Sequence, residues 1–224
     1  MSDVVGVIVF PGTNCEHDVV AALLDLGVKA KLIWHRETDL DGVQSIIIPG
    51  GFAHGDYLRP GAIARFSPVM SAVVEFANTG KAVLGICNGF QVLTEAGLLP
   101  GALQKNVGLS FLCDVVECSV ASIRSPITAN LVRDEVLALP INHFEGNYTC
   151  SVDELKRLRE EDRVLLRYVN NPNGSVDDIA AICSDRRNIV GMMPHPERAM
   201  SDLVGSSSGR KILQSLLLSL EAIS

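Results

Sequence analysis

Short apolar runs alternate with segments of helical periodicity along the first half of the chain, and this alternation limits the possible fold more than any other feature. The run at 4–10 is continuously apolar, as expected of a strand that is covered on both faces. Further strands are expected at 28–34, 45–49 and 82–86, and helices at about 15–26, 68–77 and 88–95. Strands that alternate with helices predict a parallel, doubly wound α/β sheet with flanking helices.

The second half is less regular and favours antiparallel strands. Its strand-like runs lie at 111–121, 163–169, 179–183 and 189–193. A strong turn occupies 171–175, and leucines between 213 and 220 give a closing helix one apolar face. No repeat, low-complexity tract or linker interrupts the chain. We therefore expect a single domain over residues 1–224, with an open, mostly parallel doubly wound sheet and an antiparallel second half.

The charge balance excludes several classes of partner. There are 26 acidic and 19 basic residues, which gives a net charge of −7, and no Lys/Arg run occurs. Such a chain lacks the basic surface that binds nucleic acid or an anionic membrane. No apolar run approaches the roughly 18 residues that span a bilayer. No basic segment precedes the run at 4–10, so we expect no signal peptide and a cytoplasmic location.

The six cysteines are then expected to be reduced thiols. No Cys-x-x-Cys pair occurs, and Cys113 and Cys118 have no second pair of Cys or His residues nearby. This spacing disfavours a structural zinc site, and no metal site is expected.

One short motif joins an expected strand to an expected helix and carries the chemistry: Gly85-Ile86-Cys87-Asn88-Gly89. A Gly-x-Cys-x-Gly pattern in this context predicts a nucleophile elbow, since glycines allow the tight turn. Cys87 would then project at the carboxyl end of its strand, where open α/β sheets bind ligands. Free N–H groups at the start of the helix would favour the thiolate form of the sulfur.

A nucleophilic cysteine needs an acid and base partner, and His195 is the best candidate. It lies in the run Pro194-His195-Pro196-Glu197, where the second proline favours an extended backbone. Residues at i and i+2 share a face of an extended segment, so Glu197 can hold one ring nitrogen. The other ring nitrogen would face Cys87, which predicts a Cys-His-Glu triad.

The pair Gly50-Gly51 directly follows the strand expected at 45–49. This segment could bring backbone N–H groups to an oxyanion, with the N–H of Asn88 as the second donor. An ordinary turn is the alternative.

The remaining histidines are assigned first to structure. His17 and His35 are interpreted as surface or helix-end residues. His54 lies on a loop that leaves the expected site, and His143 follows an apolar run. A contact with a ligand or partner remains open for His54, and a role at the edge of the site for His143, each beside a purely structural role.

Read together, these motifs resemble those of class I (triad) glutamine amidotransferases. More narrowly, the chain resembles the glutaminase subunits of phosphoribosylformylglycinamidine synthases, which act in purine synthesis. The matching runs are 9–15, 49–52, 55–59, 85–91, 97–103, 171–175 and 191–199. The chain departs from the usual pattern at 53–54, where Ala-His replaces Ser-Tyr, and at 142–145, where Asn-His-Phe-Glu replaces Ala-His-Gly-Glu.

The resemblance implies roles for individual residues. Cys87 would attack the side-chain amide of glutamine, and N–H groups near Gly51 and Asn88 would hold the oxyanion. His195 would protonate the departing ammonia while Glu197 steadies its ring. Gln91 would help to position glutamine.

The resemblance also implies partners. A large synthetase subunit would use the ammonia with ATP and Mg²⁺ to make formylglycinamidine ribonucleotide from formylglycinamide ribonucleotide. A small accessory subunit would complete the complex. No Gly-x-x-x-x-Gly-Lys run occurs, so no cofactor is expected in this chain.

Two other interpretations remain. A thiol hydrolase or a small stress-response protein can carry a similar cysteine elbow, and a binding module can keep the fold without catalysis. The first predicts no specific reaction with glutamine. The second predicts that Cys87 is dispensable.

Overall fold

A nine-stranded sheet forms the centre of the protein, with strand order β2-β1-β3-β4-β11-β10-β9-β6-β7. The computed structural model describes the backbone of residues 4–221 and the side chains as far as residue 219. The first five strands in this order pair in parallel. They are β1 (Val4–Val9), β2 (Lys29–Trp34), β3 (Ser45–Ile48), β4 (Ala82–Ile86) and β11 (Ile189–Met192).

The remaining strands extend the sheet with antiparallel pairs. They are β10 (Ile179–Cys183), β9 (Val164–Tyr168), β6 (Leu112–Val120) and β7 (Val136–His143). Two short strands, β5 (Ala102–Gln104) and β8 (Asn147–Thr149), form a separate antiparallel pair.

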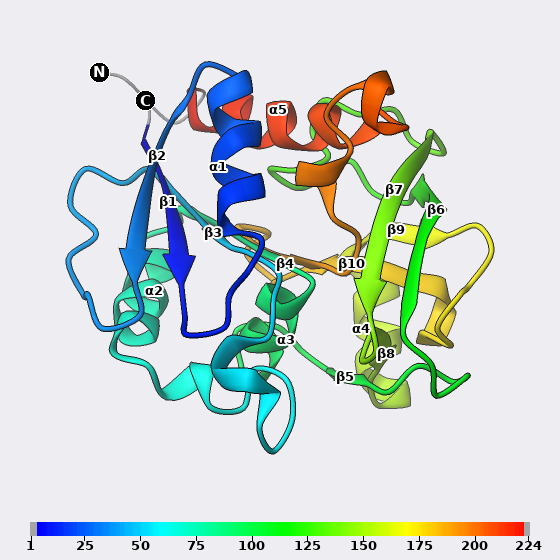
Figure 1. The fold of residues 1–224 in the computed structure, drawn as a ribbon. Helices are drawn as coiled ribbons and strands as arrows, with labels where there is room; N and C mark the ends of the chain where they lie inside the picture. Colours follow the sequence, from blue (N-terminus) through cyan, green and yellow to red (C-terminus); the bar gives the residue numbers. More distant parts are fainter. Residues whose placement is uncertain (1–3, 222–224) are drawn as a thin grey trace.

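Helices cover both faces of the sheet, as Figure 1 shows: α1 and α5 lie on one face, and α2 and α3 on the other. The helices are α1 (Glu16–Asp25), α2 (Pro68–Asn78), α3 (Asn88–Glu95), α4 (Val152–Glu160) and α5 (Ser208–Glu221). Short 3-10 turns lie at Ala53–Asp56, Ala64–Phe66, Val176–Asp178, Pro196–Arg198 and Asp202–Val204. In the part of the chain that the structure describes, no helix is long and apolar enough to cross a membrane.

The fold expected from sequence is confirmed, with its parallel half and its antiparallel half. β3, β4, β10 and β11 are buried along their whole length, which is why each appears in the sequence as an uninterrupted apolar run. Leu213 and Leu216 of the closing helix are buried as expected, whereas the side chain of Leu220 lies outside the described residues.

Four elements were absent from the sequence-based description: β5, β7, β8 and α4. β7 contains Pro140, which argues against a central strand, and the structure places β7 at the edge of the sheet, where proline is tolerated. α4 is mostly charged and buries only Leu158, so few apolar residues mark it in the sequence. Its start could have been recognised, because Ser151 and Glu154 have capping-box spacing.

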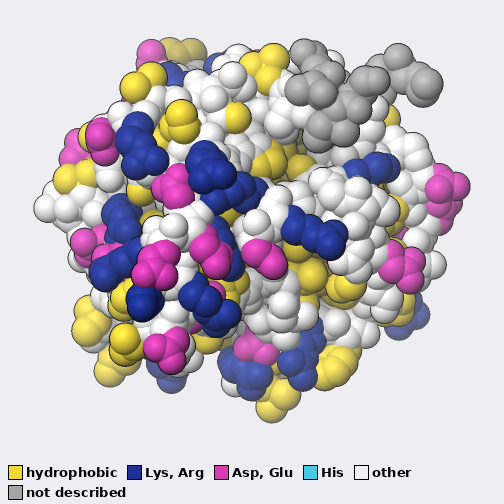
Figure 2. Space-filling view, turned by 180° about the vertical axis from the view of Figure 1, so that it is seen from behind, with side chains coloured by type: hydrophobic (Ala, Val, Ile, Leu, Met, Phe, Trp, Pro, Cys, Tyr) yellow, Lys and Arg dark blue, Asp and Glu magenta, His cyan; other side chains and the backbone are white. Residues whose placement is uncertain are grey.

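Basic side chains are interleaved with acidic ones on the face opposite to that of Figure 1, as Figure 2 shows. Over much of this face, side chains of opposite charge therefore lie beside one another.

Candidate active site

Cys87 occupies a strained turn between β4 and α3. Its backbone angles, φ 51° and ψ −105°, are unusual for a residue with a side chain. The glycines on either side are required by packing. A Cβ on Gly85 would lie 2.6 Å from the carbonyl oxygen of Gly89, and a Cβ on Gly89 would lie 1.9 Å from that of Ile48. The sequence therefore folds here into the elbow that its motif predicts.

Pairing of β4 with β11 brings His195 to this elbow. Ile86 pairs with Met192, and the N–H of Cys87 donates to the carbonyl of Met192 at 2.7 Å. His195 follows three residues later, and its N–H donates to the carbonyl of Pro140 on β7 at 2.8 Å. The Cys87 sulfur lies 3.7 Å from the carbonyl oxygen of Asn142, so β7 closes the other side of the site.

His195 and Glu197 form a buried pair, with His195 Nδ1 2.6 Å from Glu197 Oε1. Burial of the imidazole opposes its charged form, but the Glu197 carboxylate and the Cys87 sulfur outweigh this and raise the pKa of His195 well above its ordinary value. Its Nε2 is buried and has no hydrogen-bond partner among the described residues. One ring nitrogen is therefore oriented by a carboxylate, and the other is available.

The local backbone around this pair differs from expectation. His195 is extended, with φ −101° and ψ 90°, but Pro196 begins a 3-10 turn that contains Glu197. The carboxylate thus meets the ring through a turn and not through a shared strand face. The predicted contact forms by a different route.

Gly50 lies directly against the imidazole. A Cβ there would be 2.6 Å from His195 Cε1, so only glycine fits. Gly51 has φ +144°, a conformation that favours glycine, and it forms an antiparallel bridge with Thr13. The expected oxyanion segment therefore lies beside the candidate acid, and its role as a donor stays a prediction.

Asn88 and Gln91 are both buried and hydrogen-bonded to each other, with Asn88 Nδ2 donating to Gln91 Oε1 at 2.8 Å. Gln91 Nε2 donates to the carbonyl of Glu145 at 2.6 Å. Gln91 thus ties α3 to the turn after β7, and its predicted role toward glutamine is untested.

Cys15 was not identified from sequence as a site residue, although it lies behind the His195–Glu197 pair. Its sulfur accepts a hydrogen bond from Arg198 Nη2 at 3.2 Å, and Arg198 Nε donates to Asp18 at 3.0 Å. The sequence separates Cys15 from Arg198 by 183 positions, so no spacing pattern could have paired them.

Three potential metal-ligand atoms, one each from Cys15, His195 and Glu197, lie within 4.8 Å of one another. His195 Nδ1 is bonded to the Glu197 carboxylate and the Cys15 sulfur to the Arg198 guanidinium, whereas His195 Nε2 and Glu197 Oε2 have no hydrogen-bond partner among the described residues. A positive charge at the sulfur opposes a cation, so we assign the group to support of the imidazole.

The other histidines are placed by their contacts. His17 is exposed, but the expectation that His35 lies at the surface is wrong: it is buried, and its Nδ1 meets Ser67 Oγ at 3.2 Å. His54 Nε2 meets the same hydroxyl at 3.2 Å. His143 is buried with Nδ1 3.1 Å from Asn106 Oδ1, and burial together with the charge of His195 lowers the pKa of His143 to about 4.

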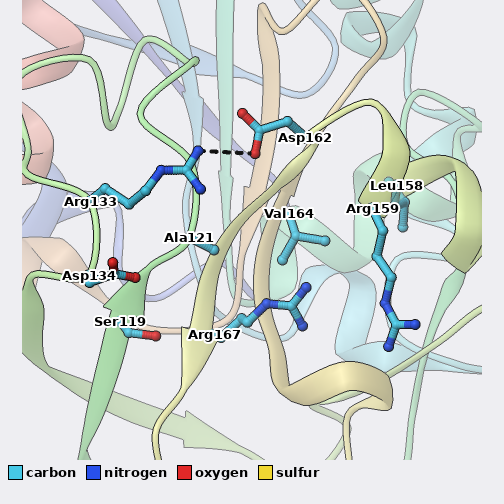
Figure 3. Close-up of a pocket in the computed structure, with 9 residues that line it drawn as sticks. All are labelled: Ser119, Ala121, Arg133, Asp134, Leu158, Arg159, Asp162, Val164 and Arg167. Carbon is cyan, nitrogen blue, oxygen red and sulfur yellow. Dashed lines mark hydrogen bonds and ion pairs between the residues drawn. The ribbon is translucent and has the colours of Figure 1, made fainter.

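A separate hollow of about 310 Å³ lies between β6, β9 and α4, and shares no lining residue with this site. Figure 3 shows Arg133 directed toward Asp162, with Arg167 in the same hollow. Arg133 Nη2 lies 3.5 Å from Asp162 Oδ1. Arg159 and Arg167 both pair with Asp177. Acidic partners therefore offset the charges of these three arginines.

Comparison with known proteins agrees with the geometry. Residues 3–215 match the model of the CobB/CobQ-like glutamine amidotransferase domain. A phosphoribosylformylglycinamidine synthase subunit PurQ from Prochlorococcus marinus is 53% identical over 95% of this chain and 98% of its own length. The subunit of the same name from Rubrobacter xylanophilus is 54% identical over 95% of this chain and 97% of its own length.

Solved structures extend the likeness. A chain in the structure of PurLQS from Thermotoga maritima superposes with a TM-score of 0.92 at 39% identity, over 98% of this chain and all of that one. A putative GMP synthase subunit from Thermoplasma acidophilum superposes with a TM-score of 0.65 at 16% identity, over 100% of this chain and 96% of that one. It shares the fold.

Proposed function

The chain belongs to the CobB/CobQ-like glutamine amidotransferase family, and from that premise we propose that it is the glutaminase subunit of a phosphoribosylformylglycinamidine synthase. It hydrolyses glutamine to glutamate and ammonia, and the ammonia passes to a synthetase subunit. The observation that carries this proposal is the sulfur of Cys87, held in a strained turn close enough to the buried His195–Glu197 pair to act on the pKa of His195. We further propose that residues 1–224 form one glutaminase domain.

The first half of the reaction forms a thioester. The Cys87 thiolate, paired with the imidazolium of His195, bonds through Sγ to the side-chain amide carbon of glutamine, and the carbonyl oxygen takes up negative charge. We assign the N–H groups near Gly51 and Asn88 to this oxygen. The imidazolium of His195, favoured by its raised pKa, gives a proton to the amide nitrogen. The C–N bond then breaks and ammonia leaves.

The second half releases glutamate. Neutral His195 takes a proton from water as the water oxygen attacks the thioester carbon. The C–S bond breaks, glutamate leaves, and the sulfur and imidazolium return to their starting states. Glu197 keeps the ring oriented through both steps, because its carboxylate holds Nδ1 at 2.6 Å.

Because this chain releases ammonia, its partners are expected to be the subunits that use ammonia. A large synthetase subunit uses the ammonia to convert formylglycinamide ribonucleotide to formylglycinamidine ribonucleotide, and a small accessory subunit completes the complex. We assign ATP and Mg²⁺ to the synthetase and no cofactor to this chain. We propose the cytoplasm as its location, where its cysteines stay reduced; Cys15, Cys87, Cys113, Cys118, Cys150 and Cys183 are all free thiols in the structure.

A diazo-ketone analogue of glutamine tests the proposal. We expect one covalent adduct per chain, on Cys87, mapped by peptide mass spectrometry. Cys113 is exposed and serves as an internal control for unspecific alkylation. Cys87→Ala should lose both the adduct and the release of glutamate.

The same experiment separates the alternatives. A thiol hydrolase of another kind would form no adduct selective for the glutamine analogue. A binding module would support glutamine-dependent synthesis equally well as Cys87→Ala. Either result would contradict the proposal.

A further inference from the structure

The side chain of Asn88, the residue after Cys87, is a junction of hydrogen bonds. Its Oδ1 accepts the backbone N–H of Ala53 at 2.9 Å. Its Nδ2 donates to Asp56 Oδ1 at 3.1 Å and to Gln91 Oε1 at 2.8 Å. The side chain is buried, and both of its ends are occupied.

This junction connects three segments that border the site. Ala53 and Asp56 belong to the loop after β3, and Asn88 and Gln91 belong to α3. Gln91 extends this hydrogen-bond network, because its Nε2 donates to the carbonyl of Glu145 in the turn after β7. Asn142, next to that turn, contacts the Cys87 sulfur through its carbonyl.

The loop that carries Asp56 is held in a strained conformation. His54, Asp56 and Leu58 have φ values of 55°, 52° and 71°, in the left-handed region that non-glycine residues rarely adopt. Such strain persists only where surrounding contacts determine the conformation, and it gathers at functional sites. The contact with Asn88 is one such constraint.

Asp56 is the ionisable member of this network. A carboxylate accepts hydrogen bonds and cannot donate them, so Asn88 must turn its NH₂ group toward Asp56 and its oxygen toward Ala53. The same orientation points the NH₂ group at Gln91. Burial raises the pKa of Asp56 to about 6, with the bond from Asn88 opposing this and Glu145 adding to it, so the carboxyl is ionised at neutral pH.

We propose that Asp56 is a positioning residue of the glutaminase site, which fixes the Asn88 amide and through it the start of α3 and the side chain of Gln91. The inference rests on the proposed function, because it concerns the pocket in which glutamine meets Cys87. Asp56 acts through Asn88 and need not touch the substrate.

The test compares Asp56→Ala and Asp56→Asn in the complex with the synthetase and accessory subunits. Asparagine keeps an acceptor oxygen and tolerates the left-handed backbone, whereas alanine does neither. Asp134→Ala is the matched control, since Asp134 is exposed, has φ 64° and lies in the remote hollow of Figure 3. Glutamate release gives kcat and KM for glutamine, and synthesis from ammonium chloride reports on the rest of the complex.

For Asp56→Ala we expect kcat/KM for glutamine to fall about tenfold to a hundredfold, with synthesis from ammonium chloride unchanged. Asp56→Asn should stay within about threefold of wild type at pH 8, because one acceptor oxygen suffices. Asp134→Ala should match wild type in both assays.

Wild-type kcat/KM in Asp56→Ala would overturn the inference. So would equal losses in both Asp56 variants accompanied by loss of ammonium-dependent synthesis, because Asp56 would then maintain the fold or the complex. Absence of glutamate release from the wild-type complex would instead refute the proposed function, and this inference with it.

Discussion

At the scale of single residues, Gly50 and His195 fit closely together in the site. A methyl group on Gly50 would lie 2.6 Å from Cε1 of the ring and 3.1 Å from Cys15 Sγ. We expect Gly50→Ala to displace the imidazole and lower kcat for glutamate release by about a hundredfold. Gly108→Ala is the control, because the nearest atom there, Ser110 Oγ, is 3.5 Å away. Normal activity in Gly50→Ala would show that the ring does not need its observed position.

The charge of Glu197 can be tested apart from its hydrogen bond. Glu197→Gln keeps an oxygen near His195 Nδ1 but removes the negative charge that raises the pKa of the ring. The imidazole should then lose its proton at lower pH, and kcat should fall about a hundredfold or more. Histidine titration by NMR, with assignment by comparison to His195→Gln, measures the pKa. If the pKa of His195 did not change, Glu197 would be excluded as the main reason that this pKa is raised.

Asp56 gives a pH dependence of known sign. Its pKa is raised in the folded protein, mainly by burial, so the folded chain binds this proton more tightly than the unfolded chain does. Its contribution to stability is therefore greatest near pH 4 and is lost as the pH rises through about 6. The melting temperature of Asp56→Asn relative to wild type should rise between pH 5 and pH 8. A constant difference would contradict the shifted pKa.

How far the sequence predicts the site depends on how local each contact is. His195 and Glu197 are two positions apart, so their contact could be inferred from the motif. The elbow at Cys87 could be inferred because its glycines lie in one short run. Contacts of Cys15 with Arg198 and of Asp56 with Asn88 join distant segments of the chain, and only the folded structure brings them together.

At the scale of elements, α3 packs on β3 through Gly89 and allows no side chain there. A Cβ would stand 1.9 Å from the carbonyl oxygen of Ile48, so Gly89→Ala must push the helix off the strand. We expect a loss of about 3 kcal/mol in the free energy of unfolding, measured with urea. Gly97→Ala separates strain from collision, because it has φ +70° but nothing within 4 Å, and should cost about 1–2 kcal/mol. Equal losses would argue against the close packing.

Elements could be predicted where burial is two-sided and could not be where it is slight. The strands β3 and β4 are fully buried and apolar, which makes their positions clear in the sequence. β7 alternates buried and partly exposed residues around Pro140, and α4 is mostly charged. The proline of β7 and the scarcity of apolar residues in α4 therefore obscure these two elements in the sequence.

At the scale of the whole molecule, the glutaminase centre draws on distant parts of the chain. β11, from the last quarter, lies between β4 and β10, so the site is assembled only when the two halves share one sheet. The alternating order of the first half was enough to predict this architecture. The position of β11 beside β4 was not predictable from periodicity, because a short apolar run carries no information about its neighbours.

A chain that makes ammonia for another subunit should be slow on its own, since uncoupled hydrolysis would waste glutamine. Gly51 has φ +144°, a conformation that favours glycine, and we expect the Gly50–Gly51 segment to change its orientation when a partner docks. We expect the synthetase and accessory subunits together to raise the rate of glutamate release per chain tenfold or more, equal to about 1.4 kcal/mol in the barrier. Release is measured with and without the partners, and Cys87→Ala in the same complex gives the background. Equal rates alone and in the complex would mean that the site is already complete, and that ammonia transfer is controlled elsewhere.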